Sequence, residues 1–314
     1  MRVVVALGGN ALLVRGESPD ADIQLHHVRS AVEALVPLAS HHQLILTHGN
    51  GPQVGLLALE SAKDPALTRP YPLDVLSAQT QGMIGYWLLQ ELERALPHRR
   101  LAALITRTLV DGRDPAFDDL QKFGGPVYDE PDARRLASQL GWVIKPDGRY
   151  WRRVVASPAP VGIVDMPLIL ELVNNNITVI CAGGGGVPVA PDGSGHLSGV
   201  EAVVDKDATA AILAEQAGAD ALLMLTDVPA VYSAYKTDHE RPIRVTGPAF
   251  LRSLQFPPGS MKPKVEAACR FVERTGRMAA IGALSDAAAI LAGDAGTVIT
   301  PAGVASVPHA VASR

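Results

Sequence analysis

Three clusters of glycine follow short apolar segments of this sequence, a position in which glycine is suited to binding an anion. The clusters are Gly8-Gly9-Asn10, Gly49-Asn50-Gly51 and Gly183 to Gly186. Glycine lets the backbone approach a ligand closely and turns N–H groups toward it, and a following helix adds its positive N-terminal end. A tight turn without a ligand explains any one cluster equally well. The three together favour a shared anion.

Lysines near predicted helix starts supply the positive charge that an anion site needs. Lys206 lies between Asp205 and Asp207 at the start of a predicted helix, Lys264 lies just inside another, and Lys122 lies in a less regular region. Phosphoryl transfer depends on positioning and on positive charge, because negative charge spreads over the transferred oxygens. Asp207 is placed to orient Lys206; alternatively, either aspartate simply caps the helix.

Two common phosphate-binding patterns do not fit. The P-loop pattern G-x-x-x-x-G-K-[ST] does not occur in the sequence. The dinucleotide pattern G-x-G-x-x-G is approached at Gly49, Gly51 and Gly55, but the last glycine comes one residue late. The acidic residue expected at the end of a second strand is missing, since Asp74 opens a predicted helix. These departures disfavour a dehydrogenase and leave phosphoryl transfer as the better hypothesis.

A further polar segment, Thr226-Asp227-Val228-Pro229, follows an apolar run and precedes Val231-Tyr232. Backbone groups and apolar side chains at a strand end are suited to an adenine pocket. A plain turn with a half-buried tyrosine is the alternative.

These loops need a sheet to bring them together, and the apolar pattern predicts one. Predicted strands alternate with predicted helices, which indicates right-handed βαβ units and an α/β fold with a mostly parallel sheet between helix layers. The predicted strands cover 2–7, 44–47, 101–109, 177–181, 221–225, 278–281 and 298–299. The predicted helices cover 24–41, 52–62, 74–95, 166–175, 206–217, 261–274 and 284–291. In such sheets, ligands bind beyond the carboxyl ends of the strands.

Residues 112–153 interrupt this alternation. They are rich in Asp, Gly, Pro and Arg and have weak periodicity. We expect one domain over residues 1–314, with 112–153 as an inserted, lid-like subdomain. A simple surface excursion is the alternative.

Composition excludes several classes of protein. Of 314 residues, 47% are hydrophobic and 19% charged, with a net charge of -4, which is typical of a globular protein and disfavours a nucleic-acid platform. No apolar stretch has transmembrane length, and Gly8 interrupts the first one too early for a signal peptide. We therefore expect no membrane contact and a cytoplasmic protein. Cys181 and Cys269 lack metal-type spacing, so we expect core thiols and no metal site.

Taken together, the motifs resemble those of the carbamate kinases, within the amino acid kinase family, nearly from end to end. The matching segments are 5–12 (V-A-L-G-G-N-A-L), 48–55 (H-G-N-G-P-Q-V-G), 80–87 (T-Q-G-M-I-G-Y-W), 151–155 with 157–158, 183–189, 199–207 (G-V-E-A-V-V-D-K-D) and 259–264. The first glycine loop is shared across the wider family, whereas the 80–87 and 199–207 segments resemble carbamate kinases specifically.

The resemblance implies a three-layer α/β/α sandwich with a mostly parallel central sheet of about eight strands and a small protruding subdomain. It further implies a homodimer and a reversible reaction in which ATP phosphorylates carbamate, giving ADP and carbamoyl phosphate, with Mg²⁺. Carbamate is already an oxyanion, so the chemistry requires no general base. The source of carbamoyl phosphate, from arginine metabolism or from purine-derived ureido compounds, stays open, as does the physiological direction.

The resemblance also assigns site residues. Three are expected to face the transferred phosphoryl group: Gly8, Gly9 and Asn10. Three are expected to hold the carbamate end: Gly49, Asn50 and Gly51. Lys206 would stabilise the phosphoryl group, Asp207 would orient the cations, Lys122 would reach the substrate from the subdomain, and Lys264 would contact the nucleotide phosphates. The remaining nucleotide-site residues are expected to be Gly184, Gly185, Gly186, Asp227, Tyr232 and Met261.

Two positions depart from the family pattern: Ala159 stands where many relatives carry a charge, and Lys262 adds a cation beside Lys264. Two other activities are alternatives. A related kinase acting on a carboxylate such as acetylglutamate would be supported by an arginine set for the second carboxylate or by an appended regulatory domain. A non-catalytic regulator would be favoured by loss of Lys206 or Lys264, and both are present.

Overall fold

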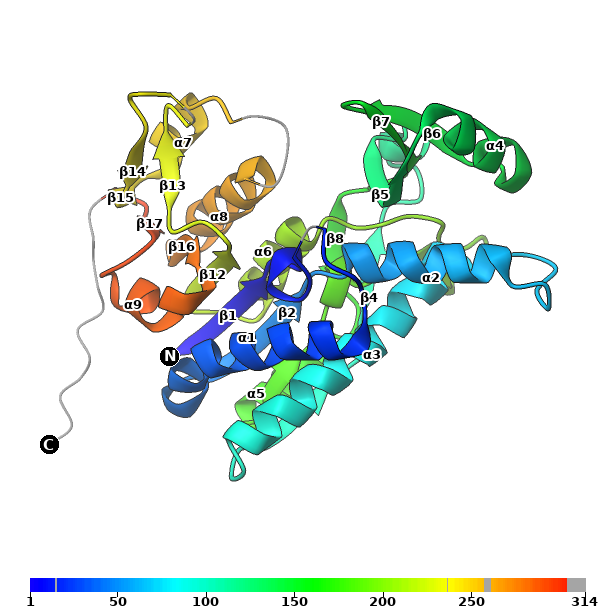
Figure 1. The fold of residues 1–314 in the computed structure, drawn as a ribbon. Coiled ribbons are helices and arrows are strands. Elements are labelled where there is room, and N and C mark those ends of the chain that lie inside the picture. The colour runs from blue at the N-terminus through cyan, green and yellow to red at the C-terminus, as the bar shows by residue number, and fades with distance from the viewer. Residues whose placement is uncertain (15, 236, 257–260, 304–314) are drawn as a thin grey trace, which may run out of the picture.

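The computed structural model describes residues 1–14, 16–235, 237–256 and 261–303, and it leaves the side chains of Asn10 and Pro126 undescribed. Gly259 and Ser260 of the 259–264 motif therefore lie outside the described residues. An eight-stranded sheet crosses the molecule (Figure 1). In sheet order its strands are β15 (Val245–Thr246), β17 (Thr297–Ile299), β16 (Met278–Ala283), β12 (Ala221–Thr226), β1 (Arg2–Leu7), β2 (Gln43–His48), β9 (Thr178–Ile180) and β3 (Leu101–Ala103).

Apolar runs form the centre of this sheet because helices cover both of its faces. Successive side chains of a strand point to opposite faces, so Val4 and Ala6 pack in one layer and Val3, Val5 and Leu7 in the other. Helices α5 (Met166–Asn174), α6 (Lys206–Gln216) and α8 (Met261–Thr275) contribute to the first layer. Helices α1 (Ala21–His41), α3 (Leu73–Ala95) and α9 (Ala287–Ala292) contribute to the second. The predicted three-layer α/β/α sandwich is confirmed.

The neighbours β12, β1, β2 and β9 pair in parallel, whereas β16 and β17 pair antiparallel. The sheet is thus mostly parallel, as predicted. The predicted strand 298–299 is present as β17, but it does not form the edge of the sheet, because the two-residue strand β15 lies outside it. A strand of two residues carries no periodic signal in the sequence.

The predicted strand 101–109 is also wrong as a single element. It divides into β3 and β4 (Arg107–Val110), which belong to different sheets. Between them, the side chain of Gln81 on α3 accepts from Thr106 N at 2.9 Å and donates to Thr106 O at 3.2 Å. Thr106 N is thus bonded to a side chain instead of a neighbouring strand, while Thr106 O also accepts from Val187 N at 2.8 Å, next to the start of the second sheet. Beyond it, β4 pairs with β10 (Val187–Pro191) and β8 (Pro160–Ile163), and β11 (Leu197–Gly199) completes this second sheet.

The insert forms regular structure despite its weak periodicity. Its three-stranded sheet has the order β5 (Lys122–Tyr128), β7 (Tyr150–Val155), β6 (Val143–Asp147), and α4 (Glu130–Leu140) packs on it. This unit stands apart from the main sheet (Figure 1). It is joined to the body where α2 (Gly51–Lys63) meets β5: a Cβ on Gly55 would lie 2.6 Å from Gly125 Cα. Only glycine permits so close an approach of the two backbones.

A short hairpin of β13 (Val231–Ser233) and β14 (Arg241–Ile243), followed by α7 (Pro248–Ser253), lies beside the far end of the sheet (Figure 1). Cys181 and Cys269 are free and buried, which confirms the expectation of core thiols, although Cys181 directly follows β9 rather than lying within it. Among the described residues, no helix has both the length and the apolarity to cross a membrane.

Candidate functional site

Four neighbouring parallel strands bring the predicted loops to one edge of the main sheet. The segments after β12, β1, β2 and β9 contain Asp227 and the three glycine clusters. Gly8 N donates to Leu225 O at 2.9 Å, and Gly49 N donates to Leu7 O at 3.1 Å. The ladder therefore continues into the loops and sets their register.

The first two glycine loops touch each other. A Cβ on Gly49 would lie 2.9 Å from Gly9 Cα, and one on Gly8 would lie 3.1 Å from Leu225 O. Such distances leave no room for a side chain, so glycine is needed to bring these backbones together. The predictions for the phosphoryl and carbamate groups thus fall on adjoining segments. The side chain of Asn10 lies outside the described part of the chain.

The second loop leads directly into α2. Gly51 is its first residue and Pro52 follows, while the side chain of Asn50 caps no backbone N–H in the described structure. The first N–H groups of a helix have no intrahelical partner, and the helix dipole makes this end positive. The start of α2 is therefore available to an anionic group beside the first loop.

The four-glycine turn lies directly behind the second loop. Gly184, Gly185 and Gly186 have φ of 65°, 96° and 86°, a region that favours glycine. A Cβ on Gly184 would overlap the Asn50 amide, and one on Gly185 would lie 2.5 Å from Val204 O. All four glycines are buried. Close packing against the second loop accounts for Gly183 and Gly184, and packing against Val204 and Thr108 accounts for Gly185 and Gly186. The predicted contact of this turn with nucleotide stays a prediction.

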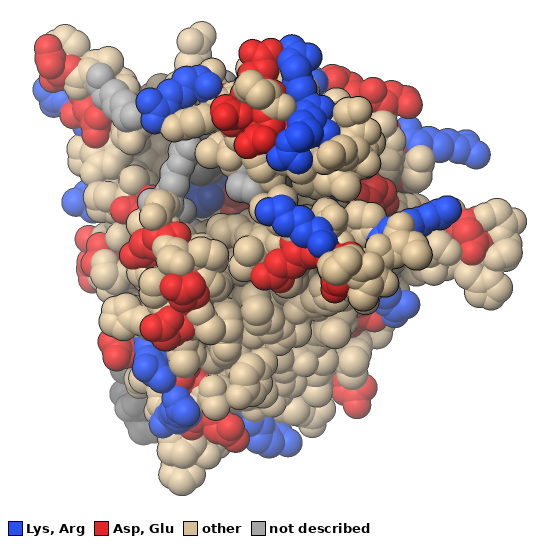
Figure 2. All heavy atoms as spheres, turned by 45° about the vertical axis from the view of Figure 1, so that its right-hand side comes forward, with Lys and Arg blue, Asp and Glu red and all other residues tan. Residues whose placement is uncertain are grey.

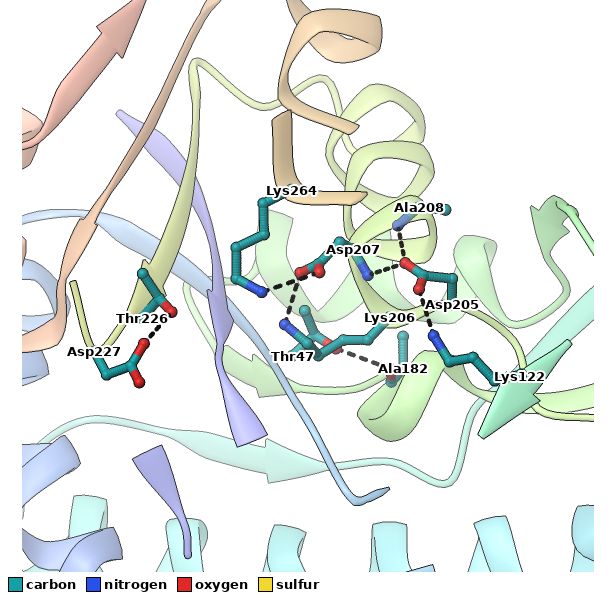
Figure 3. A network of polar contacts seen from close by, with 10 residues as sticks. All are labelled: Thr47, Lys122, Ala182, Asp205, Lys206, Asp207, Ala208, Thr226, Asp227 and Lys264. Atoms are coloured by element: carbon teal, nitrogen blue, oxygen red, sulfur yellow. Dashed lines mark hydrogen bonds and ion pairs between the residues drawn. The ribbon is translucent and has the colours of Figure 1, made fainter. Parts of the chain in front are cut away.

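Threonine hydroxyls hold this turn in place. Gly185 O accepts from Thr108 Oγ1 at 2.8 Å and from Thr209 Oγ1 at 3.1 Å. Thr47 Oγ1 on β2 donates to Ala182 O at 2.8 Å (Figure 3). The turn is therefore connected to β4, α6 and β2.

His48 closes the space between the second loop and the turn. Its Nδ1 lies 3.0 Å from Gly49 O, and a Cβ on Gly183 would overlap its ring. Burial lowers the pKa of His48 to about 4; the hydrogen bond to Gly49 opposes this shift and the charge of Lys206 adds to it. The ring is therefore neutral at pH 7, and Nδ1 carries the proton that it donates to Gly49 O.

Asp207 joins the two predicted lysines. Its Oδ1 lies 2.8 Å from Lys206 Nζ and its Oδ2 lies 3.2 Å from Lys264 Nζ, so that α6 and α8 meet at one carboxylate (Figure 3). The three side chains are 13%, 8% and 7% exposed for Lys206, Asp207 and Lys264. Burial works to raise the pKa of Asp207, but the two ammonium groups outweigh it and hold that pKa below its usual value. The group carries one net positive charge.

The pKa of Lys206 is lowered, first by burial and further by the charge of Lys264, while Asp207 opposes both. Its charged form is thus poorly solvated. The negative charge of a bound anion would compensate the ammonium of Lys206, so this lysine is suited to binding a phosphoryl group.

Asp205 connects the insert to the same helix start. Its Oδ1 accepts from the backbone N–H groups of Asp207 and Ala208, at 3.0 and 3.1 Å, and so caps α6. Its Oδ2 lies 2.7 Å from Lys122 Nζ on β5 (Figure 3). The capping alternative is therefore correct for Asp205, while Asp207 contacts Lys206 as predicted. Lys122 therefore reaches the start of α6, the helix that carries Lys206 and Asp207.

The remaining predicted residues lie on neighbouring elements. Asp227 follows β12 and accepts from Thr226 Oγ1 at 3.0 Å (Figure 3). Tyr232 is half-buried on β13, and Met261 begins α8 and packs against the core. The additional cation, Lys262, is exposed.

A hollow of about 590 Å³ adjoins Asp205 and is lined mainly by residues of α8. Its charged lining is largely paired: Arg252 contacts Glu266 and Glu273, and Arg274 contacts Glu215. On the face drawn in Figure 2, acidic and basic side chains are interspersed in the same way. The chemistry described above lies instead in backbone loops and buried lysines.

Three contributors were not predicted as site residues: Thr80, His48 and Asp205 as the partner of Lys122. Thr80 Oγ1 accepts from Asn50 Nδ2 at 2.9 Å. Its place in the 80–87 motif was the signal available in the sequence. Within the described ranges, no group of three or more His, Cys, Asp or Glu side chains is placed to hold a metal ion.

Comparison with known proteins gives consistent similarities. The model of the amino acid kinase family matches residues 1–282. The carbamate kinase of Rhizobium meliloti (strain 1021) is 51% identical over 304 residues, covering 96% of this chain and 93% of that protein. The carbamate kinase of Escherichia coli (strain K12) is 49% identical over 298 residues, covering 95% and 99%. The structure of carbamate kinase from Giardia lamblia bound to AMP-PNP superposes with a TM-score of 0.88 at 37% identity, covering 96% and 98%.

Proposed function

The chain belongs to the amino acid kinase family, and its similarity to carbamate kinases shows its activity, ATP-dependent phosphoryl transfer to carbamate. We infer from the structure how its residues carry out this reaction. The observation that carries this inference is the sharing of Asp207 between Lys206 and Lys264 beside two touching glycine loops. Buried positive charge and backbone N–H groups are what a transferring phosphoryl group requires.

The reaction proceeds by direct displacement. A carbamate oxygen forms a bond to the γ-phosphorus of ATP, the bond from that phosphorus to the β–γ bridging oxygen breaks, and ADP leaves; the reverse reaction makes ATP. Carbamate is an oxyanion already, so no group has to remove a proton. The protein's contribution is to hold two anions together against their repulsion.

We assign the groups to the loops accordingly. Gly8, Gly9 and Asn10 surround the transferred phosphoryl group, and Gly49, Asn50 and Gly51 hold carbamate at the start of α2. Support comes from the contact between Gly9 and Gly49 and from the uncapped start of α2. Lys206 stabilises the charge of the transferred group, and Asp207 keeps Lys206 and Lys264 in position.

The nucleotide lies on the side of α8. Lys264 contacts its phosphates, and Asp227, Tyr232 and Met261 line the nucleoside part. Support comes from the place of Lys264 one turn inside α8 and of Asp227 after β12, the strand next to β1. We further propose that Gly184 supports Asn50 from behind, and that Gly184, Gly185 and Gly186 contact the nucleotide through their backbone.

Residues 112–153 act as a lid within a single domain over 1–314. Lys122 reaches the substrate from this lid, and its contact with Asp205 already places it at the start of α6. Binding of a phosphate would offer Lys122 a doubly charged partner in exchange for the carboxylate.

The Mg²⁺ that the resemblance implies would be bound through the nucleotide phosphates and would neutralise part of their charge. Both oxygens of Asp207 contact lysines, so Asp207 keeps its role of positioning Lys206 and Lys264. From the family resemblance we also propose a homodimer in the cytoplasm, supplied with carbamoyl phosphate by arginine metabolism or by the breakdown of purine-derived ureido compounds.

The experiment compares rival substrates. Purified protein with Mg²⁺ is given carbamoyl phosphate and ADP, and ATP is measured; in parallel, ATP is given with acetylglutamate and ADP is measured. ATP formation in the first reaction, with no ADP formation above background in the second, supports the proposal. The opposite pattern identifies the carboxylate kinase instead.

A further inference from the structure

The side-chain amide of Asn50 is held in one orientation by Thr80. Asn50 Nδ2 lies 2.9 Å from Thr80 Oγ1, and Thr80 Oγ1 in turn donates to Ser77 O at 2.9 Å, one turn earlier in α3. A hydroxyl has a single hydrogen. Because that hydrogen is used for Ser77 O, Thr80 can only accept from Asn50, so the group facing it is the NH₂. The amide oxygen therefore points away from Thr80.

The surroundings prevent the amide from turning over. Asn50 is 5% exposed, Thr80 is fully buried, and Gly184 lies so close that a Cβ there would overlap the amide. A flipped amide would place its oxygen against a hydroxyl whose hydrogen is already in use, leaving two acceptors face to face. The orientation is therefore set by packing and by hydrogen bonding together.

The amide oxygen has no hydrogen-bond partner within the described part of the chain. Asn50 Nδ2 is engaged, whereas Asn50 Oδ1 accepts from no described donor. Asn50 lies between Gly49, which touches the first glycine loop, and Gly51, which begins α2. The acceptor thus belongs to the residue that joins the contact between the two glycine loops to the uncapped start of α2.

Building on the proposed function, we propose that Thr80 is a positioning residue for substrate selection: it aims Asn50 Oδ1 at the amino group of carbamate. Carbamate differs from acetate in carrying an N–H donor next to its carboxylate, where acetate has a methyl group. A site built to hydrogen-bond an N–H group leaves its acceptor unpaired when the analogue lacks that group. The enzyme should therefore prefer carbamoyl phosphate to acetyl phosphate as phosphoryl donor to ADP.

The test measures this preference as the ratio of kcat/KM for carbamoyl phosphate to kcat/KM for acetyl phosphate, with ATP as the product. Thr80→Val removes the hydroxyl at nearly constant shape, and we expect the ratio to fall about tenfold or more, the effect of one unpaired polar group. Thr80→Ser keeps the hydroxyl and should keep the ratio. Thr47→Val is the matched control: it removes another buried hydroxyl near the site, one that donates to Ala182 O, and should change both substrates alike.

A ratio that survives Thr80→Val overturns the inference, even if both rates fall, because a merely structural role would lower them together. Should Thr80→Val not fold, Asn50→Ala removes the acceptor directly and carries the same expectation. The proposed function and this inference fail in different ways. If the wild type forms no ATP from carbamoyl phosphate, the proposed function is contradicted. If it forms ATP but does not prefer carbamoyl phosphate to acetyl phosphate, only the role of Thr80 is contradicted.

Discussion

The ammonium of Lys206 lies 2.8 Å from one carboxylate oxygen of Asp207, and the two residues are neighbours in the first turn of α6. The other oxygen of the same carboxylate lies 3.2 Å from Lys264 Nζ on α8. The single buried negative charge of Asp207 thus keeps two lysines side by side. Removal of this carboxylate would leave two ammonium groups poorly solvated and uncompensated.

Asp207→Asn should therefore destabilise the fold as well as slow turnover. Removing one partner of a buried ion pair costs about 3–5 kcal/mol, because the remaining charge is left uncompensated. The control is Glu215→Gln on the same helix, whose partner Arg274 is largely exposed; loss of such a pair costs about 0–1 kcal/mol. Urea unfolding of both variants measures the difference. Equal losses in the free energy of unfolding would show that Asp207 does not hold the two lysines together.

Acid should weaken the fold through His48. Its pKa is about 4 in the folded protein, against 6.5 when unperturbed. As pH falls below 6.5, the unfolded chain binds a proton that the folded chain does not, so the free energy of unfolding falls with pH until about pH 4. The loss is at most about 3 kcal/mol for a shift of this size. In His48→Gln, the free energy of unfolding should depend less on pH across this window; an unchanged slope would mean that His48 titrates normally.

Lys122→Met should raise KM for carbamoyl phosphate roughly tenfold or more, since a hydrogen bond to a charged group contributes about 1.5–3 kcal/mol. Methionine keeps the length of the side chain and removes its charge. Lys145→Met is the matched variant, because Lys145 lies in the same small sheet but forms its ion pair with the exposed Asp119, at 3.5 Å. Steady-state kinetics on both variants would contradict the lid role if the two KM values were alike.

Gly184→Ala should be far more harmful than Gly218→Ala. Both glycines have positive φ, 65° and 59°, so both alanines carry backbone strain of about 1–2 kcal/mol. Only at Gly184 would the new Cβ also overlap a neighbour, the Asn50 amide; Gly218 faces open space. We expect a further loss of about 1–3 kcal/mol from overpacking and a marked fall in turnover. Similar unfolding midpoints for the two variants would show that the turn does not support Asn50.

Much of the fold could be predicted because it depends on local pattern. The runs at 2–7, 44–47 and 221–225 are uniformly apolar, and they form the buried strands β1, β2 and β12. Parallel order then places their carboxyl ends together, which is why the glycine loops were expected at one site. The prediction of one strand over 101–109 was wrong because the break after Ala103 is stabilised by Gln81, a residue of another element.

The site was less accessible to prediction where it depends on contacts across long sequence separations. Lys122 and Asp205 are 83 residues apart, and Asn50 and Thr80 are 30 apart. Glycine is ambiguous for a similar reason. A cluster that opens toward a ligand and one that packs against a neighbour look the same in sequence, and Gly184 is of the second kind toward Asn50.

The most direct test of the account is ATP formation by Lys206→Met. Wild-type protein with Mg²⁺, ADP and carbamoyl phosphate should make ATP, and the variant, checked for its fold by circular dichroism, should lose at least a hundredfold in kcat, since a preorganised group at the developing charge contributes about 2.7–4 kcal/mol. A folded variant that makes ATP at a near-normal rate would contradict the central claim that phosphoryl transfer depends on the lysines held by Asp207.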